Sequence, residues 1–284
     1  MQWIKETWFM LTIEMDYFDL GQICESGQCF RMKKIGENRW NVIAGDKYLE
    51  LTQENGIVNF FCPEEEFLFF WISYFDLDND YGEYIKGINP RDRYLTEAAE
   101  MGKGIRILRQ DLWEMIVSFL ISQRNNIKRI RRCIESISVE FGEKKITSEG
   151  AEYYAFPTPE ALALATEEQL KNCNLGYRAK YVKKVSGEVA AGTVSLESIE
   201  NMKYKDAKKE LMKLYGVGEK VADCICLFGL HHLEAFPVDT HIRQALNVHY
   251  RKGFPHRRYK NCQGIMQQYI FYRELIGIKP DREK

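Results

Sequence analysis

The hydrophobic pattern of this chain of 284 residues changes its period once, and that change divides it into two structurally different parts. Over residues 31–61, apolar and polar side chains alternate, and turn-forming pairs such as Asn55-Gly56 interrupt the alternation. Patterning of period two with such turns is typical of an antiparallel meander. From about residue 95 onward, the apolar side chains instead recur with the period of a helix.

Helix start signals recur throughout the second part. Asp111 precedes a segment that is apolar nearly all round, as in a buried central helix. Thr158 precedes a proline at the first helical position, and Thr166 begins a capping box. The sequence therefore predicts an α+β fold, with an antiparallel sheet domain over residues 1–98 and a mostly helical domain over residues 99–284.

Charge is unevenly divided between the two parts, although the whole chain carries 40 basic and 41 acidic side chains. Residues 1–100 contain 9 Lys and Arg against 19 Asp and Glu, and residues 101–284 contain 31 against 22. A polyanionic partner would therefore contact the second part. The apolar runs are too short to cross a bilayer, and the N-terminus does not fit a secretory signal. We expect no membrane partner and an intracellular protein, in the cytoplasm or nucleoid if bacterial.

Eight cysteines are scattered along the chain, and no pair has the spacing of a zinc knuckle or a redox motif. No four of them cluster as an iron–sulfur site requires. Free thiols in a reducing compartment are the simplest interpretation. The positions are Cys24, Cys29, Cys62, Cys133, Cys173, Cys224, Cys226 and Cys262.

The most informative stretch contains two glycines, Gly216 and Gly218, between a predicted helix over 207–214 and another over 219–229. These glycines permit a tight hairpin between the helices. They also let backbone N–H groups approach an anion at the start of the second helix, where the macrodipole favours negative charge. On spacing alone, phosphate binding and an ordinary helical hairpin both remain open.

Lys220 and Asp239 are the two candidate reactive side chains. Lys220 lies in the first turn of the second predicted helix among apolar neighbours, so we expect a lowered pKa and a nucleophilic amine. Asp239 fits an N-cap, and its ionised carboxylate could also stabilise positive charge if the hairpin brings Lys220 opposite. The alternatives are an ordinary surface lysine and an aspartate that only caps a helix.

Several segments resemble, in order, those of 8-oxoguanine DNA glycosylases, a branch of the helix-hairpin-helix superfamily. The hairpin and Pro237–His241 resemble the superfamily's helix-hairpin-helix and Gly/Pro/Asp element, whereas Ser26–Arg31 and Gly176–Tyr181 resemble the 8-oxoguanine branch. Three further segments share the resemblance: Leu108–Asp111, Asn125–Ile127 and Gln267–Phe271. The resemblance implies a sheet domain of TATA-binding-protein-like shape, followed by two helical subdomains with the active-site cleft between them.

The same resemblance implies a monomeric enzyme that excises 8-oxoguanine from double-stranded DNA and then nicks the abasic strand by β-elimination. Lys220 would be the Schiff-base nucleophile, and Asp239 would assist it. The residues implied in base binding are Gly27, Cys224, Gln267 and Phe271. The residues implied in DNA binding are Arg124, Asn125, Arg129, Tyr177, Arg178, Gly216, Gly218 and His241. No cofactor is implied, and the only metal implied is a cation held by the backbone carbonyls of Met212, Leu214 and Val217.

The Gly27 role has a physical basis. Its carbonyl would accept the N7–H that 8-oxoguanine has and guanine lacks. Normal guanine would instead present a lone pair to that carbonyl, which leaves two desolvated acceptors face to face. Tyr177 would fill the stack after the base leaves, and Arg178 and Arg129 would face the orphaned cytosine.

This sequence departs from the family pattern at two positions. Tyr215 stands where the hairpin often has Pro, and Arg124 stands where relatives commonly have an Asn that bonds the orphaned cytosine. That role would pass to Arg124, Asn125 or Gln123. Three other functions remain open: a glycosylase of this fold for another damaged base, a module that binds DNA without chemistry, and an interaction protein that docks through the acidic domain.

Overall fold

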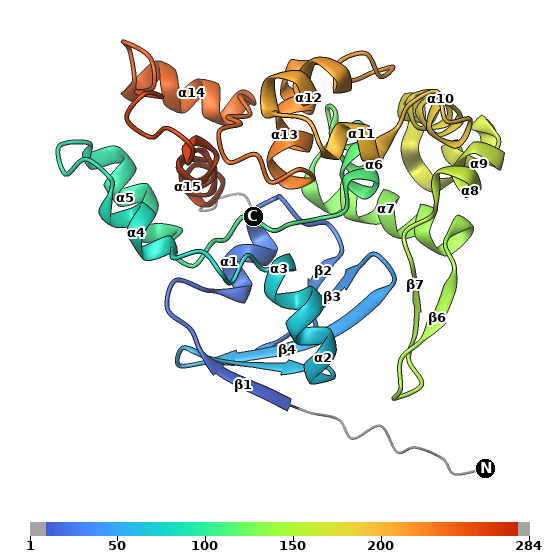
Figure 1. Ribbon diagram of the computed structural model, residues 1–284, viewed down its shortest axis with the longest axis horizontal. Helices are drawn as coiled ribbons and strands as arrows, with labels where there is room; N and C mark the ends of the chain where they lie inside the picture. The colour runs from blue at the N-terminus through green and yellow to red at the C-terminus, as the bar shows by residue number, and fades with distance from the viewer. Residues whose placement is uncertain (1–9, 278–284) are drawn as a thin grey trace, which may run out of the picture.

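The computed structural model describes residues 10–277, and its N-terminal part is a five-stranded sheet in the order β1-β5-β4-β3-β2 (Figure 1). All neighbouring strands are antiparallel, so the predicted meander is confirmed. Asn55 and Gly56, with φ of 50° and 81°, form the turn between β4 and β5, since both conformations suit a tight hairpin. The strands are β1 (Met10–Glu14), β2 (Met32–Lys34), β3 (Arg39–Ala44), β4 (Lys47–Glu54) and β5 (Ile57–Phe61).

One face of this sheet is buried, which explains its period-two pattern. On β3, Trp40, Val42 and Ala44 point into an apolar core, and their neighbours along the strand are more exposed. α1 (Leu20–Glu25) and one helical stretch supply residues to the same core. That stretch comprises α2 (Glu64–Glu66), the π-helical η1 (Phe67–Trp71) and α3 (Ile72–Tyr74).

The C-terminal part is mainly helical, with one small hairpin of β6 (Lys144–Ile146) and β7 (Glu152–Tyr154). Figure 1 shows α4, α5, α14 and α15 on one side and α6 to α11 on the other, with α12 and α13 between them. The helices are α4 (Tyr81–Lys86), α5 (Arg93–Met101), α6 (Leu112–Ser122), α7 (Ile127–Phe141), α8 (Pro159–Leu164), α9 (Glu167–Leu170), η2 (Lys171–Leu175), η3 (Gly176–Arg178), α10 (Ala179–Ala190), α11 (Leu196–Glu200), α12 (Tyr204–Leu211), α13 (Glu219–Phe228), α14 (Thr240–His249) and α15 (Gln263–Gly277).

The predicted helix starts are confirmed. The side chain of Asp111 caps α6, Thr158 caps α8 with a proline at its start, and Thr166 forms a complete capping box. Every residue from Leu112 to Ile121 is buried, because α7, α10, α11 and α13 all pack against α6. The helix expected over 207–214 instead runs three residues earlier, as α12.

The predicted domain boundary at residue 98 falls inside α5. Buried side chains of α4 and α5, including Tyr81, Leu95 and Ala98, belong to the larger helical core, and α5 packs on α15. The sheet core ends at Phe75, apart from Leu108. The periodicity of the sequence did not locate the boundary between the two hydrophobic cores. The stretch from α2 to α3 is helical, but it packs against the sheet and belongs to the sheet core.

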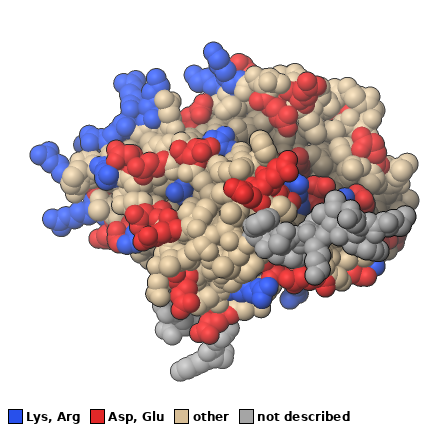
Figure 2. All heavy atoms as spheres, turned by 60° about the horizontal axis from the view of Figure 1, so that its bottom comes forward, with Lys and Arg blue, Asp and Glu red and all other residues tan. Residues whose placement is uncertain are grey.

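The uneven charge of the sequence is visible on the surface. In Figure 2, Asp and Glu are spread over the face that is turned forward, whereas Lys and Arg gather at its left edge. Glu14, Glu37 and Glu54 are among the exposed acidic side chains of the sheet part. Within the described residues, no helix is long and apolar enough to span a membrane.

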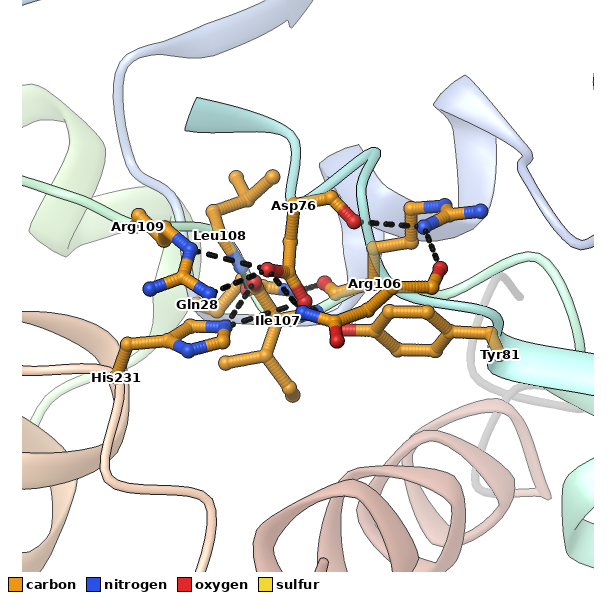
Figure 3. Close-up of polar contacts among 9 residues, drawn as sticks. Gln28, Asp76, Tyr81, Arg106, Ile107, Leu108, Arg109 and His231 are labelled. Atoms are coloured by element: carbon orange, nitrogen blue, oxygen red, sulfur yellow. Dashed lines mark hydrogen bonds and ion pairs between the residues drawn. The ribbon is translucent and has the colours of Figure 1, made fainter. Parts of the chain in front are cut away.

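A buried polar cluster around Asp76 joins the two cores (Figure 3). The Asp76 carboxylate is 2.8 Å from the guanidinium of Arg109 and 3.3 Å from Nε2 of His231. It also accepts a hydrogen bond of 3.0 Å from the Tyr81 hydroxyl. Arg106 donates to the backbone carbonyl of Asp76 at 2.8 Å. The segment that leads into α6 is therefore fixed against both parts of the protein.

This cluster makes a testable contribution to stability. Burial by itself raises the pKa of Asp76, but His231, Asn79 and Arg109 outweigh it and lower the pKa to about 2. A carboxyl group whose folded pKa is lowered stabilises the fold above its unfolded pKa, and that contribution disappears as the pH falls through the folded value. We expect the stability lost in Asp76→Asn to shrink by about 2 kcal/mol as the pH falls from about 4 to about 2.

Urea unfolding of the wild type and of Asp76→Asn at a series of pH values measures this difference. Asparagine tolerates the left-handed backbone that Asp76 adopts, with φ of 53°, so the substitution adds little strain. A stability difference that stays constant as the pH falls through this window would show that the carboxylate charge contributes nothing.

Candidate active site

A cavity of about 1190 Å³ lies between the groups of helices. Its walls come from the Ser26-Gly27 loop, the turn between α6 and α7, the first half of α13, residues 237–243 and one face of α15. This volume accommodates a molecule of nucleoside size with room for part of a chain attached to it.

The fold brings Lys220 and Asp239 to the same cavity. Lys220 lies in the first turn of α13, and its Nζ is 5.5 Å from the centroid of the Phe119 ring. Asp239 caps α14, because its Oδ1 accepts a hydrogen bond of 2.8 Å from the backbone N–H of Ile242. This cap uses only one of the two carboxylate oxygens of Asp239.

The charge state of Lys220 differs from the sequence-based prediction. Burial by itself lowers the pKa of Lys220, but Cys224 and the charge of Asp239 outweigh burial, and the pKa is raised. The prediction of a lowered pKa is wrong for the free protein, because it considered desolvation without the two titratable neighbours. The resting side chain is therefore an ammonium group, which must lose a proton before it can act as a nucleophile.

The four predicted base-binding residues also line this cavity. Gln267 and Phe271 lie one turn apart on α15. The side chain of Gln267 is buried, and its Nε2 donates to the Pro237 carbonyl at 3.1 Å, whereas its Oε1 has no partner among the described residues. A buried amide oxygen without a partner is unfavourable, so it favours a ligand that donates a hydrogen bond there.

Gly27 is restricted to glycine by its surroundings. Its φ is 75°, and a Cβ atom at this position would lie 3.1 Å from the ring of Phe271. A side chain at position 27 would therefore be strained by the backbone conformation and would crowd the Phe271 ring. Cys224 lies on the α13 wall, and burial raises the pKa of its thiol.

The predicted DNA-binding residues divide into two sets. Arg124, Asn125, Gly218 and His241 line the cavity. The other four do not line it: Arg129 is exposed, Tyr177 is 45% exposed, Gly216 is in the hairpin turn between α12 and α13, and Arg178 is buried.

The hairpin turn packs closely against neighbouring elements. Gly216 has φ of 91°, and a Cβ atom there would clash with the Tyr181 ring at 2.7 Å. Gln123, at the end of α6, donates to the Gly216 carbonyl at 3.0 Å, and Tyr177 donates to the Gln123 carbonyl at 3.2 Å. The ends of α6 and η3 therefore support the turn.

Arg178 is not at the surface. It is 3% exposed, and its Nε donates to the Gln123 carbonyl at 2.7 Å while its Nη2 donates to the Arg124 carbonyl at 2.8 Å. In the free protein, Arg178 supports the turn that presents Arg124, so its predicted contact with an orphaned base finds no support here. The sequence could not distinguish an arginine that contacts DNA from an arginine that supports a neighbouring turn, because both roles are compatible with an arginine in a loop.

Phe119 and Gln268 are among the residues of the cavity that were not predicted from the sequence. Phe119 lies against Lys220. Because α6 is apolar nearly all round, its sequence does not indicate which of its faces borders the cavity. Gln268 also lines the cavity and is 2% exposed. Nothing in its sequence neighbourhood marks it as different from a surface glutamine.

No group of three or more His, Cys, Asp and Glu side chains capable of holding a metal occurs within residues 10–277. All eight cysteines are free, as predicted. Met212, Leu214 and Val217 lie at the link between α12 and α13, where the Leu214 carbonyl already accepts a hydrogen bond of 3.0 Å from Val217. A cation at these carbonyls stays a prediction.

Comparison with known families gives two matches that together cover most of the chain. Residues 10–116 match the N-terminal domain of 8-oxoguanine DNA glycosylase, and residues 117–265 match the HhH-GPD superfamily of base excision DNA repair proteins. The N-glycosylase/DNA lyase of Saccharomyces cerevisiae is 33% identical over 297 residues, which cover 95% of this chain and 78% of the yeast protein. N-glycosylase/DNA lyase OGG1 of Arabidopsis thaliana is 30% identical, over 84% of this chain and 67% of its own.

Solved structures agree with these matches. The Clostridium acetobutylicum 8-oxoguanine glycosylase/lyase, in complex with double-stranded DNA containing cytosine opposite 8-oxoguanine, superposes with a TM-score of 0.90 at 36% identity. The aligned part covers 96% of this chain and 99% of that chain. A 3-methyladenine DNA glycosylase from Archaeoglobus fulgidus superposes with a TM-score of 0.73 at 17% identity, which indicates a shared fold.

Proposed function

Because the chain belongs to the 8-oxoguanine DNA glycosylase family of the HhH-GPD superfamily, we propose that its cavity excises 8-oxoguanine with Lys220 as the nucleophile. The observation that carries this proposal is convergence on a single cavity. A partly buried lysine, a carboxylate and the predicted base-binding residues come from four separate segments and line the same 1190 Å³ space. The protein acts as a monomer on double-stranded DNA, from which it extrudes the damaged nucleotide.

The neutral amine of Lys220 attacks C1′ of the extruded nucleotide. A nitrogen–carbon bond forms at C1′ while the bond from C1′ to the base breaks, and the electron pair leaves with the base, which takes up a proton. Asp239 stabilises the positive charge that develops on the sugar. The sugar ring then opens to a Schiff base on Lys220, and loss of a proton from C2′ expels the 3′-phosphate by β-elimination.

The base-binding wall fits an oxidised guanine. Guanine and 8-oxoguanine both carry N–H donors on their Watson–Crick edge, which suit the unpartnered Oε1 of Gln267. Phe271 and Cys224 lie on two walls of the same cavity and hold the base between them. The Gly27 carbonyl then distinguishes 8-oxoguanine from guanine, because only 8-oxoguanine presents an N–H at N7.

We expect the protein to excise 8-oxoguanine and to leave guanine in place. Duplexes that carry 8-oxoguanine opposite each of the four bases, with guanine as the control, test this under single-turnover conditions. Products separated with and without alkali treatment distinguish excision from strand cleavage. Because Arg124 replaces an asparagine at the position expected to face the opposite base, we also expect the excision rates opposite the four bases to lie within about tenfold, or about 1.4 kcal/mol, of each other.

Two outcomes would contradict the proposal. Binding of the duplex without excision would indicate a non-catalytic DNA-binding module. Excision of an alkylated purine in place of 8-oxoguanine would indicate the substrate of a different branch of this fold.

A further inference from the structure

Three buried glutamines hydrogen-bond within the loop that carries Gly27: Gln28, Gln110 and Gln268. We propose that Gln28 and Gln268 are positioning residues that fix the Gly27 carbonyl and thereby set the discrimination between 8-oxoguanine and bases without an N7–H. This inference rests on the proposed function, since it concerns how the base is read, and it assigns neither glutamine a contact with the base.

Gln28 makes three hydrogen bonds with its side-chain amide, although it is completely buried. Its Nε2 donates to the Arg106 carbonyl at 2.8 Å and to the Ser26 hydroxyl at 2.9 Å. Its Oε1 accepts from the backbone N–H of Leu108 at 2.9 Å. Only an amide supplies two donors and an acceptor in this arrangement, so the loop is fastened to the segment that leads into α6.

The carbonyls on either side of Gly27 are both engaged. Gln268, on α15, donates from Nε2 to the Ser26 carbonyl at 2.5 Å, and Gln110 donates to the Gln28 carbonyl at 3.0 Å. Within the part of the chain that the structure describes, no group donates to the Gly27 carbonyl. Of these three successive carbonyls, the Gly27 carbonyl is therefore the one left open, and Gly27 lies in the wall of the cavity.

The segment that holds Gln28 is itself rigidly supported (Figure 3). The backbone N–H of Ile107 donates to the Tyr81 hydroxyl at 2.8 Å, and that hydroxyl donates to Asp76. Nε2 of His231 lies 3.2 Å from the Ile107 carbonyl, and Arg106 donates to the Asp76 carbonyl. The position of Gly27 is thus tied through Gln28 to both cores of the protein and through Gln268 to the helix that carries Gln267 and Phe271.

Accurate placement matters because the Gly27 carbonyl must both attract and repel. It attracts an N7–H within hydrogen-bonding distance, and it excludes a base that presents a lone pair or a bulkier group at the same point. A carbonyl that can retreat by a fraction of an ångström loses part of the attraction and most of the exclusion. Loosening the loop should therefore lower the ratio of the excision rate of 8-oxoguanine to that of a base without an N7–H. A general loss of stability would instead lower both excision rates together.

The test compares 8-oxoguanine with 7-methyl-8-oxoguanine, in which a methyl group replaces the hydrogen on N7. Single-turnover excision of each base opposite cytosine is measured for the wild type, Gln28→Met and Gln268→Met. We expect the ratio of the two rates to fall by about tenfold or more in each variant, because tenfold corresponds to about the net free energy of a single hydrogen bond.

Gln53→Met is the matched control. The Gln53 amide likewise bridges backbone groups, since its Oε1 accepts from Leu20 and its Nε2 donates to the Phe18 carbonyl, both at 2.7 Å. It lies in the sheet part and does not line the cavity. We expect this variant to keep the wild-type ratio even if its free energy of unfolding falls as much as that of Gln28→Met.

The outcomes separate this inference from the proposed function. If the wild type excises no 8-oxoguanine, the proposed function fails. If the wild type excises it and both glutamine variants keep the wild-type ratio, the positioning role is wrong. Gln268→Met removes one hydrogen bond where Gln28→Met removes three, so it decides the question should Gln28→Met fail to fold.

Discussion

Lys220→Gln is expected to lower single-turnover excision of 8-oxoguanine by at least about a thousandfold, because removal of a covalent nucleophile can cost up to about a millionfold in rate. Glutamine keeps much of the length of lysine and its packing against Phe119, but it has no amine to attack C1′. Borohydride reduction should trap a covalent complex between the wild type and the damaged duplex, and it should trap none with the variant.

Lys128→Gln is the control for the loss of a positive charge near DNA. Lys128 also lines the cavity but is exposed, at the start of α7. We expect this variant to bind the duplex more weakly at high salt and to form the trapped complex normally. A trapped complex that persists in Lys220→Gln would show that another amine is the nucleophile.

The raised pKa of Lys220 adds a requirement to this chemistry. The ammonium group of the free protein is stabilised by Cys224 and Asp239 beside it, so excision must be preceded by loss of that proton. Burial also raises the pKa of the Cys224 thiol, and the charge of Asp239 adds to the effect of Cys224 on Lys220. In the proposed mechanism, the Asp239 carboxylate stabilises a cation both before the reaction and during it, so its charge is expected to matter at both stages.

Local signals in the sequence predicted the framework of this site well. A glycine-rich turn followed by Lys220, and a capping aspartate before α14, depend on a few adjacent residues, and the structure has both at the predicted places. The antiparallel meander followed in the same way from alternation and turn residues.

Long-range contacts account for what the sequence did not predict. The burial of Arg178 depends on the Gln123 and Arg124 carbonyls, more than 50 residues away. The bond from Gln268 to Ser26 spans 242 residues. Cys224 on the same helix contributes most to the raised pKa of Lys220, and the further contribution of Asp239 comes from another element. Composition and periodicity carry no information on such pairs, although these pairs determine how the reactive groups are held.

Asp239→Asn tests whether the carboxylate does more than cap α14. Asparagine is as good an N-cap as aspartate, so the hydrogen bond to the Ile242 N–H should remain and the free energy of unfolding should change by less than about 0.5 kcal/mol. The negative charge opposite the developing positive charge is lost, and loss of one preorganised electrostatic group typically lowers a rate by about a hundredfold to a thousandfold. Single-turnover excision and urea unfolding measure the two effects separately.

Asp19→Asn supplies the comparison, because Asp19 caps α1 with the same geometry, 2.8 Å to the backbone N–H of Gln22, and does not line the cavity. We expect it to change stability as little as Asp239→Asn does and to leave excision at the wild-type rate. If Asp239→Asn also keeps a rate within about twofold of the wild type, well below the loss expected for an electrostatic group, then Asp239 is only a cap. Stabilisation of the sugar cation would then have to come from another group, and the pairing of Lys220 with Asp239 would have no part in the chemistry.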